Sequence, residues 1–317
     1  MTEARGDVPT VLVGGHESAQ GTDLAALGHA LPGVLVARPG RALHDAVSGF
    51  LTRGQPTVAV LPMTWGRDPV MVAETAKTLR WLTSEDGRGR VALCSTLGTP
   101  AHLVAWLRHA ATLTARRSPH TTLILAAHAA NPFDDAELYR LAHLVRVHGA
   151  VGAVEVACVQ DARDVDAAVE RARVLGADDV VVVPAGFERG LPAEVRARVS
   201  FFGPLVSDQA LVRVVRDRVA DVVHELRHGD DGIDAGLLAD HGHGYAHSHA
   251  FEAESESGAG SGAGSGEHPR SHAHPHAHPH TPGHRQVQAH GVAWRSAGED
   301  LAHSETPSVH GASPVEA

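Results

Sequence analysis

The chain has 317 residues, 43% of them hydrophobic, and a formal net charge of −10 at pH 7. This length and apolar content suit two domains, each with a sizeable core. After residue 228 three arginines face twelve acidic residues, so the acidic charge is concentrated there and the remainder is close to neutral. A near-neutral body gives no electrostatic reason to bind nucleic acid, and an acidic end attracts cations and repels phosphate.

Cysteine usage and the apolar runs are typical of a cytoplasmic protein. Cys94 and Cys158 lie in strand-like runs and form no Cys-x-x-Cys pair, which indicates buried, reduced thiols. The N-terminus lacks a basic-then-apolar signal pattern. No apolar run approaches the ~18 residues of a membrane-spanning helix. We therefore expect a cytoplasmic location and no membrane partner.

Short apolar runs and longer amphipathic segments alternate along the chain. The predicted strands are 10–13, 34–37, 57–61, 90–94, 122–126, 153–157, 179–183 and 199–202. The predicted helices are 44–53, 70–82, 101–113, 135–147, 164–176 and 209–226. Continuous apolar strands alternating with helices indicate an α/β fold, in which helices cover both faces of a parallel sheet.

The predicted elements occur twice. Three pairs of blocks match in the same order and at nearly one spacing: TVLVGGHESAQGTDLAAL with TLILAAHAANPFDDAEL, TVAVLPMTWGRDP with DVVVVPAGFERGLP, and TLGTPAHLVAWLRHA with PLVSDQALVRVVRDR. We therefore predict two duplicated, four-stranded parallel βαβα lobes, at 8–118 and 119–228. Gly, Ser, His, Pro and acidic residues dominate 229–317. This segment buries too little apolar surface to offset chain entropy, so it is predicted to be a disordered tail.

Histidine is concentrated in this tail, which holds 14 of the 25 histidines. Neutral imidazoles bind Ni²⁺, Co²⁺, Zn²⁺ and Cu²⁺, and alternating His-x-His lets several rings converge on one ion. The predicted ligands are His241, His243, His247, His249, His272, His274, His276, His278 and His280. The alternatives are an inert solvated tail and a purification tag. Irregular spacing and interleaved acidic residues disfavour the tag.

Two further histidines occupy equivalent places in the repeat. His16 and His128 each follow the first strand of a lobe, at the carboxyl edge where open parallel sheets bind ligands. Glu155 lies within a strand-like run, where a carboxylate is costly unless it is paired, ligating or at a strand end. If the second strand neighbours the first, His128 and Glu155 form a site for a divalent first-row metal and a pair of bases. The alternatives are unrelated loop histidines and a solvated glutamate.

The loop TWGRDP (64–69) follows the third strand and is a candidate ligand-binding loop. Trp65 offers a face for stacking on a flat macrocycle, and Arg67 offers a partner for a carboxylate. The alternative is a turn in which Asp68 caps the next helix and Pro69 takes its first position. No GxGxxG or Walker pattern is present, so no nucleotide is expected.

At these residues the chain resembles the sirohydrochlorin cobaltochelatase family, the class II, ATP-independent tetrapyrrole chelatases. VLVGGHES and LILAAHAANPFDDAEL each resemble the family's apolar strand ending in His-Gly-Ser. AVEVACVQDARDVDAAVERARVLGADDVVVVPAGF resembles its Val-Glu strand, the helix that follows and the next strand. The resemblance spans about residues 8–227 and implies a long form of two fused chelatase units.

The resemblance implies a lyase that inserts a divalent metal into sirohydrochlorin or a related tetrapyrrole in cobalamin synthesis. In the family, a first-strand histidine holds the metal, and a glutamate and a second histidine help to remove pyrrole protons. His16 and His128 match the first histidine, and Glu155 matches the glutamate. No residue matches the second histidine, because the loops after the third strands read TWGRDP and GFERGLP. HES in place of His-Gly-Ser is a further departure.

The implied metal is Co²⁺, with Ni²⁺ and Fe²⁺ as alternatives, and the implied partner is an acidic tetrapyrrole. The loop arginines that would pair with its carboxylates are Arg38, Arg41, Arg67 and Arg189. The missing histidine leaves several interpretations open. In the first, residues from both halves complete the site. In the second, the metal comes from elsewhere. In the third, the chain is a non-catalytic metal-binding or delivery protein on a chelatase scaffold. A tetrapyrrole-modifying lyase of other specificity and an oligomeric state also stay open.

Overall fold

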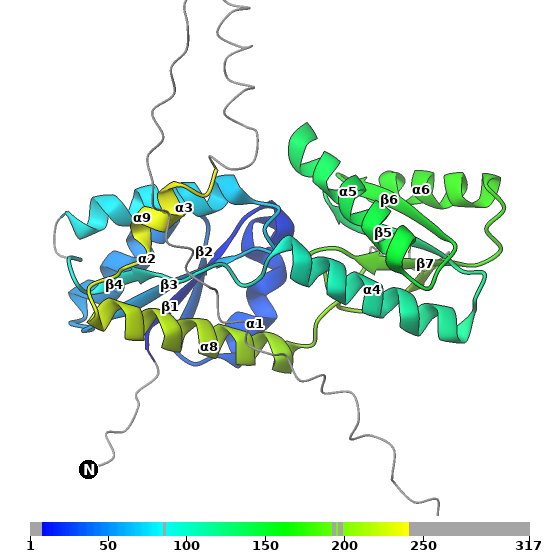
Figure 1. The fold of residues 1–317 in the computed structure, drawn as a ribbon. Coiled ribbons are helices and arrows are strands. Elements are labelled where there is room, and N and C mark those ends of the chain that lie inside the picture. The colour runs from blue at the N-terminus through cyan, green and yellow to red at the C-terminus, as the bar shows by residue number, and fades with distance from the viewer. Residues whose placement is uncertain (1–7, 85–86, 192–194, 196–198, 241–317) are drawn as a thin grey trace, which may run out of the picture. The chain divides into compact units, whose positions relative to one another are not determined.

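The computed structural model describes residues 8–84, 87–191, 195 and 199–240 (Figure 1). These residues form two four-stranded sheets, with strand orders β2-β1-β3-β4 and β6-β5-β7-β8. Every strand pair is parallel. The predicted α/β fold with two duplicated parallel sheets is therefore confirmed. The predicted disordered tail lies outside the described residues from residue 241 onward.

All eight predicted strands are present. The first sheet contains β1 (Thr10–Gly14), β2 (Val34–Ala37), β3 (Val58–Met63) and β4 (Val91–Leu93). The second contains β5 (Thr122–His128), β6 (Ala153–Val159), β7 (Val180–Pro184) and β8 (Ser200–Phe201). The central strand β1 and its neighbour β3 are buried along their whole length, which is why their sequences are uninterrupted apolar runs.

The described helices follow the strands in chain order. They are the 3₁₀ segment η1 (His16–Leu24), α1 (Ala25–Ala30), α2 (Arg41–Thr52), α3 (Pro69–Thr83), α4 (Pro100–Arg117), α5 (Pro132–His148), α6 (Ala162–Val174), α8 (Asp208–Arg227) and α9 (Ile233–Leu237). Three of them begin with proline after a capping side chain, which is Asp68, Thr99 or Asn131. Each cap accepts a backbone N–H that the first helical turn leaves unsatisfied.

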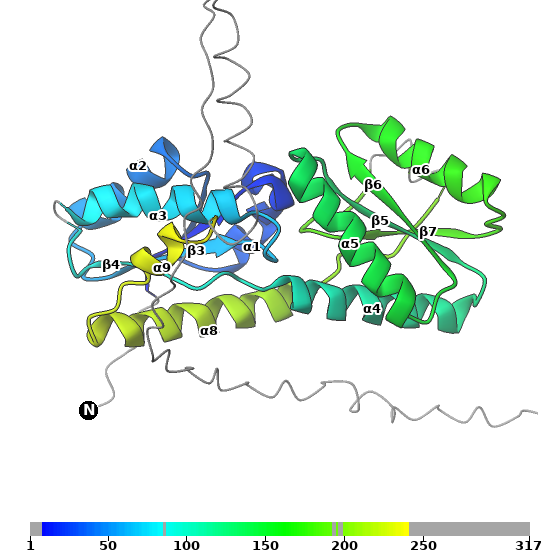
Figure 2. The same cartoon turned by 45° about the horizontal axis from the view of Figure 1, so that its top comes forward.

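Two helices pack against the sheet of the opposite repeat. Helix α4 follows the first sheet in sequence but contacts β7 and α5, and α8 follows the second sheet but contacts β3, β4 and α1. Figures 1 and 2 show both helices beside these partners. The predicted lobes at 8–118 and 119–228 thus hold one sheet each, but α4 and α8 each pack against the sheet of the other lobe. Amphipathic periodicity shows that a helix has an apolar face, but not which sheet that face covers.

The exchange of helices joins the two repeats through a common core. Leu12 and Leu61 of the first sheet and Leu123 and Leu125 of the second belong to one cluster of buried side chains. The opposite faces of the two sheets carry separate clusters. The division of the chain into lobes is therefore a division of the sheets and not of the hydrophobic core.

The folded part also extends beyond the predicted start of the tail at residue 229. The Leu93 N–H donates to the Asp231 carbonyl oxygen at 2.8 Å. Helix α9 packs against α3 and β4, and Ile233 is fully buried. The prediction was wrong for 229–240, because one buried isoleucine in a polar segment gives too weak a signal in the sequence.

The two cysteines were both predicted to be buried and reduced; Cys94 is buried, whereas Cys158 is only half-buried. Cys94 and Cys158 are both free, and burial raises the pKa of Cys158 to about 11 and that of Cys94 further still. Both therefore stay protonated at neutral pH. Among the described residues, every helix is too short or too polar to span a bilayer.

A pair of glycines tests the docking of α9. Gly229 and Gly232 both have positive φ, but a Cβ at Gly229 meets open space, whereas one at Gly232 lies 2.2 Å from the Leu93 carbonyl oxygen. Gly229→Ala should cost about 1 kcal/mol of unfolding free energy from backbone strain alone. Gly232→Ala should cost about 2–4 kcal/mol, because the backbone must also move. Urea unfolding measures both, and equal costs would contradict the docking described.

Candidate functional site

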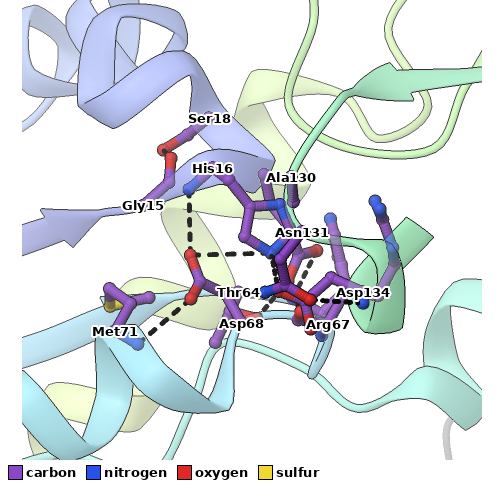
Figure 3. Close-up of polar contacts among 12 residues, drawn as sticks. Gly15, His16, Ser18, Thr64, Arg67, Asp68, Met71, Ala130, Asn131 and Asp134 are labelled. Atoms are coloured by element: carbon purple, nitrogen blue, oxygen red, sulfur yellow. Dashed lines mark hydrogen bonds and ion pairs between the residues drawn. The ribbon is translucent and has the colours of Figure 1, made fainter. Parts of the chain in front are cut away.

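The first candidate centre surrounds His16, which begins η1 at the carboxyl end of β1. Its ring is mostly buried, with 12% of the side chain exposed. The ring Nε2 lies 2.9 Å from the carbonyl oxygen of Arg67, and the backbone N–H donates to Asp68 Oδ2 at 2.9 Å. Asp68 also accepts the Met71 N–H at 3.0 Å, so it caps α3 as the alternative interpretation predicted (Figure 3). One carboxylate thus fixes the start of a helix and the backbone of the histidine.

A second carboxylate reaches His16 from the other repeat. Asp134, on the first turn of α5, lies 3.4 Å from His16 Nε2, and Asp68 lies 3.8 Å from the same atom. Figure 3 shows the ring between these two acids. Residues far apart in the sequence therefore meet at the carboxyl edges of both sheets, as expected for ligand sites in parallel sheets.

The contacts define which nitrogen of His16 is free. A carbonyl oxygen can only accept, so the Nε2 beside Arg67 carries the proton and Nδ1 carries the lone pair. Nδ1 is buried and has no hydrogen-bond partner among the described residues. An imidazole held through one nitrogen by an oxygen acceptor presents the other to a metal or a proton.

The second centre surrounds His128, at the end of β5. Its Nε2 lies 2.9 Å from Asp23 Oδ2 and 3.8 Å from Glu188 Oε1. Its backbone N–H donates to Glu188 Oε1 at 3.1 Å. Asp23 lies in η1, and Glu188 lies in the loop after β7. This histidine therefore also meets one acid from each repeat.

The two centres follow one plan. In each, the histidine N–H is held by an acid from the loop after the third strand of its own sheet, Asp68 or Glu188. In each, the ring contacts an acid from the segment after the first strand of the other sheet, Asp134 or Asp23. The family's second histidine was expected in the loops that supply Asp68 and Glu188. Carboxylates occupy these loops in this chain.

Burial and hydrogen bonding raise the pKa values of acidic and imidazole groups in both centres. Burial raises the pKa of Asp134 to about 6 and that of Glu188 to about 7, although the neighbouring histidines oppose the shift. The hydrogen bond that the His128 ring donates to Asp23 raises the pKa of His128. Groups that exchange protons near pH 7 are suited to general acid–base work.

A buried glutamate holds the two centres together. Glu17 is 1% exposed and accepts the backbone N–H groups of Trp65 (3.1 Å) and Arg67 (2.9 Å) and the hydroxyl of Thr64. Its own carbonyl oxygen accepts the Phe187 N–H at 3.1 Å. Burial raises the pKa of Glu17, although the Arg67 charge opposes the shift. The residue thus links η1, the loop after β3 and the loop after β7.

Trp65 is not available for stacking on a substrate, contrary to the prediction. It is 5% exposed, and its ring stacks on that of Phe187 with centroids 5.7 Å apart and planes 16° apart. Gly98 lies so close that a Cβ there would come within 2.4 Å of the Trp65 ring. Trp65 and Phe187 occupy equivalent loops of the repeat, so the aromatic pair packs the two repeats together.

The four arginines predicted to bind the substrate differ in their access to the cavity beside His16. Arg67 is 1% exposed, and its three guanidinium nitrogens have no hydrogen-bond partner among the described residues, so burial removes it from a substrate in the open cavity. Arg189 forms a two-point ion pair with Asp208, at 2.5 and 2.8 Å. Arg38 and Arg41 line the cavity beside His16. Arg38 and Arg41 thus stay candidates for substrate contact, whereas Arg67 is buried and Arg189 is paired with Asp208.

Glu155 is also not at the candidate site. Strand β6 does neighbour β5, as the prediction required, but Glu155 pairs in register with Ile124, four residues before His128. At about 3.3 Å per residue, this places it about 13 Å from the carboxyl end of the strand. Its carboxylate lies 3.9 Å from Arg171. Apolar patterning predicts a strand but not the height of one residue along it.

The cavity at the first centre has a volume of about 570 Å³. Gly15, His16, Arg38, Arg41, Asp68 and Asp134 are among the residues that line it. With Glu74, which also lines it, the wall combines an imidazole, three carboxylates and two guanidinium groups. His128 and Glu188 do not line this cavity, so the two centres differ in their access to it.

No group of three or more His, Cys, Asp or Glu side chains in the described part of the chain is arranged to hold a metal ion. The predicted pairing of His128 with Glu155 is not formed, because Glu155 lies beside Ile124, four residues before His128. A metal that meets His16 would keep most of its coordination positions for other ligands. The nine predicted tail ligands, from His241 to His280, lie outside the described residues.

Comparison with solved structures finds several similar chains. SirB from Bacillus subtilis with Fe³⁺ shares 12% identity at a TM-score of 0.44, over 68% of this chain and 98% of that one. The sirohydrochlorin chelatase SirB from Bacillus subtilis subspecies spizizenii in complex with cobalt shares 12% identity at 0.40, over 67% and 94%. DR2241 from Deinococcus radiodurans, a multi-domain protein with structural similarity to chelatases, shares 19% at 0.38, over 68% and 55%. No family model and no curated protein matches.

The raised pKa of Glu188 makes a testable contribution to stability. Between its usual value of 4.5 and about 7, the unfolded chain ionises this group and the folded chain does not, so stability falls as pH rises through this window. The unfolding free energy of the wild type should fall from pH 5 to pH 8. In Glu188→Gln this fall should be smaller by about 1–3 kcal/mol. Denaturant unfolding at both pH values measures this.

The matched control is Glu170→Gln, which removes an exposed carboxylate on α6 and should follow the wild type. An unchanged pH dependence in Glu188→Gln would contradict the burial of that carboxylate.

Proposed function

We propose that this chain inserts a divalent metal into a tetrapyrrole without a nucleotide. Sirohydrochlorin or a relative in cobalamin biosynthesis is the proposed substrate, and Co²⁺ is the favoured metal, with Ni²⁺ and Fe²⁺ as alternatives. The observation that carries this proposal is His16 on the wall of a cavity that also presents arginines: its Nδ1 has no hydrogen-bond partner among the described residues, and its Nε2 lies 3.4 Å from Asp134.

Metal insertion requires a ligand that releases the metal readily and groups that accept two pyrrole N–H protons. His16 Nδ1 supplies a single neutral nitrogen donor, and the carboxylates of Asp68 and Asp134 lower the cost of bringing a cation to it. With a pKa of about 6, Asp134 is mostly ionised at neutral pH and accepts a proton. A metal bound by so few protein ligands transfers to the four nitrogens of a macrocycle without a large loss of coordination.

Arg38 and Arg41 are the proposed substrate anchors. They lie on the cavity wall, and guanidinium groups bind the carboxylate arms of an acidic macrocycle in a fixed orientation. Two charged anchors at one rim would direct the pyrrole nitrogens towards His16. In this proposal the first centre performs the insertion, and the His128 centre, which does not line the cavity, has a lesser role.

The second candidate function is a metal-binding or delivery protein that does not catalyse insertion. The absence of three-ligand groups among residues 8–84, 87–191, 195 and 199–240 and the histidine-rich C-terminus favour it. In that case the tail carries the metal, and the cavity serves another ligand or none.

Substitution of the two histidines separates these functions. His16→Ala should reduce the rate of Co²⁺ insertion into sirohydrochlorin by about 100-fold or more, because it removes the metal donor and its acid–base partner. His128→Ala should reduce it by less than about tenfold. The change in visible absorbance on metal insertion measures the rate.

The matched control is His120→Ala, which removes an exposed histidine before β5, at the opposite edge of the same sheet. It should retain the wild-type rate. Equal rates for His16→Ala and the wild type would reject the assigned centre, and no insertion by the wild type with any of the three metals would favour the delivery function.

Removal of the tail tests its proposed role in metal storage. The truncation belongs after Asp240, because residues 229–240 pack on the first sheet. The shortened chain should bind several fewer Ni²⁺ or Co²⁺ ions by equilibrium dialysis and keep its insertion rate at saturating metal, because the tail acts by raising local metal concentration. Unchanged metal stoichiometry would contradict metal binding by the tail.

A further inference from the structure

An exposed stripe on α8 combines two carboxylates and two imidazoles. Asp217, Asp221, His224 and His228 are all exposed and are spaced at i, i+4, i+7 and i+11. This spacing places them along one side of a helix. The buried side chains of α8, including Leu211, Val215 and Val222, lie on the opposite side, so the stripe takes no part in packing the core.

The two imidazoles are already in contact. The ring centroids of His224 and His228 are 4.7 Å apart, with an interplanar angle of 66°. Histidines at i and i+4 on one helix face are a known arrangement for binding a transition metal. With metal–nitrogen bonds of about 2.0–2.1 Å, small rotations of two exposed side chains suffice to bring one nitrogen of each ring to a shared ion.

The local charge favours a cation. His228 is the C-cap of α8, and the last carbonyl groups of a helix carry partial negative charge that attracts cations. Asp217 and Asp221 add two formal negative charges one to three turns earlier in the stripe.

This position is separate from the candidate functional site. His224 lies 16 residues after Asp208, which pairs with Arg189 near the second centre. At 1.5 Å per residue this is about 24 Å along the helix. The two histidines therefore take no part in the candidate functional site.

We propose that His224 and His228 form a surface site for a borderline divalent metal ion such as Ni²⁺, Cu²⁺, Co²⁺ or Zn²⁺. The protein supplies two imidazole nitrogens, and solvent fills the remaining positions. Such an open site exchanges its metal readily, in contrast to a closed four-ligand structural site. The choice of metals follows from the imidazole donors, which favour these ions over Mg²⁺ and Ca²⁺.

Histidine-selective labelling of the full chain tests this site in the presence of the tail. Diethyl pyrocarbonate modifies free imidazoles, and peptide mass spectrometry assigns each modified residue, so tail histidines are read separately. The chain is titrated with NiCl₂ to an excess over its 25 histidines. His224 and His228 should become protected together, at a nickel concentration at least tenfold below that which protects His143, an exposed histidine on α5 with no second histidine three or four residues away.

Single substitutions distinguish a shared ion from separate weak contacts. In His228→Ala, half-protection of His224 should shift at least tenfold, to the concentration found for His143. His224→Ala should have the same effect on His228. Both residues are exposed, and an unchanged far-UV circular dichroism spectrum shows that the helix is intact. Protection of His224 that is unaffected by His228→Ala, or that occurs only at the His143 concentration, would overturn the site.

Discussion

The candidate site depends on the hydrogen bonds that the buried carboxylate of Glu17 accepts. Burying an unpaired carboxylate costs several kcal/mol, and here three donors from residues 64–67 and the nearby Arg67 charge offset that cost. The same hydrogen bonds hold the Arg67 carbonyl group, which in turn orients the His16 ring. A residue that touches no cavity thus determines which nitrogen of the neighbouring histidine is free.

The exchange of α4 and α8 joins the two repeats into one fold. Each helix follows the last strand of one sheet and covers the other sheet, so neither repeat has a complete core without its companion. The Trp65–Phe187 stack and the hydrogen bond from Phe187 to Glu17 strengthen the same junction. Because Asp134 and Asp23 each reach the histidine of the other repeat, both centres require this junction to be closed.

Sequence patterning predicted the sheets well because each strand is a continuous apolar run between helices. It also placed His16 and His128 correctly at the carboxyl edges, because each directly follows a first strand. The four acids around them were harder to find. Asp134 contacts a histidine more than one hundred residues away in the chain, and that contact depends on how the repeats pack. Asp68 and Glu188 carried a visible signal, since both lie in the loops where the resemblance required a histidine.

The errors have equally specific causes. Trp65 and Arg67 follow a strand in a polar loop and suggested ligand contacts, yet the loop folds inward onto Glu17. Arg189 forms an ion pair with Asp208. This partner lies on α8, a helix that was predicted only from its periodicity, so the ion pair could not be foreseen. Residues 229–240 looked like the start of the tail because glycine and aspartate dominate them, and Ile233, which anchors them, is their only fully buried hydrophobic residue.

The position of Glu155 on an edge strand accounts for a carboxylate within an apolar run. Strand β6 is the outermost strand of its sheet, and an uncovered outer strand can pair with a strand of another molecule. Glu155 puts a charge on this border, and Arg171 lies beside it and donates to the Val156 carbonyl oxygen at 3.0 Å. A charged pair and an already occupied backbone carbonyl group both hinder a foreign strand from pairing with this edge of the sheet.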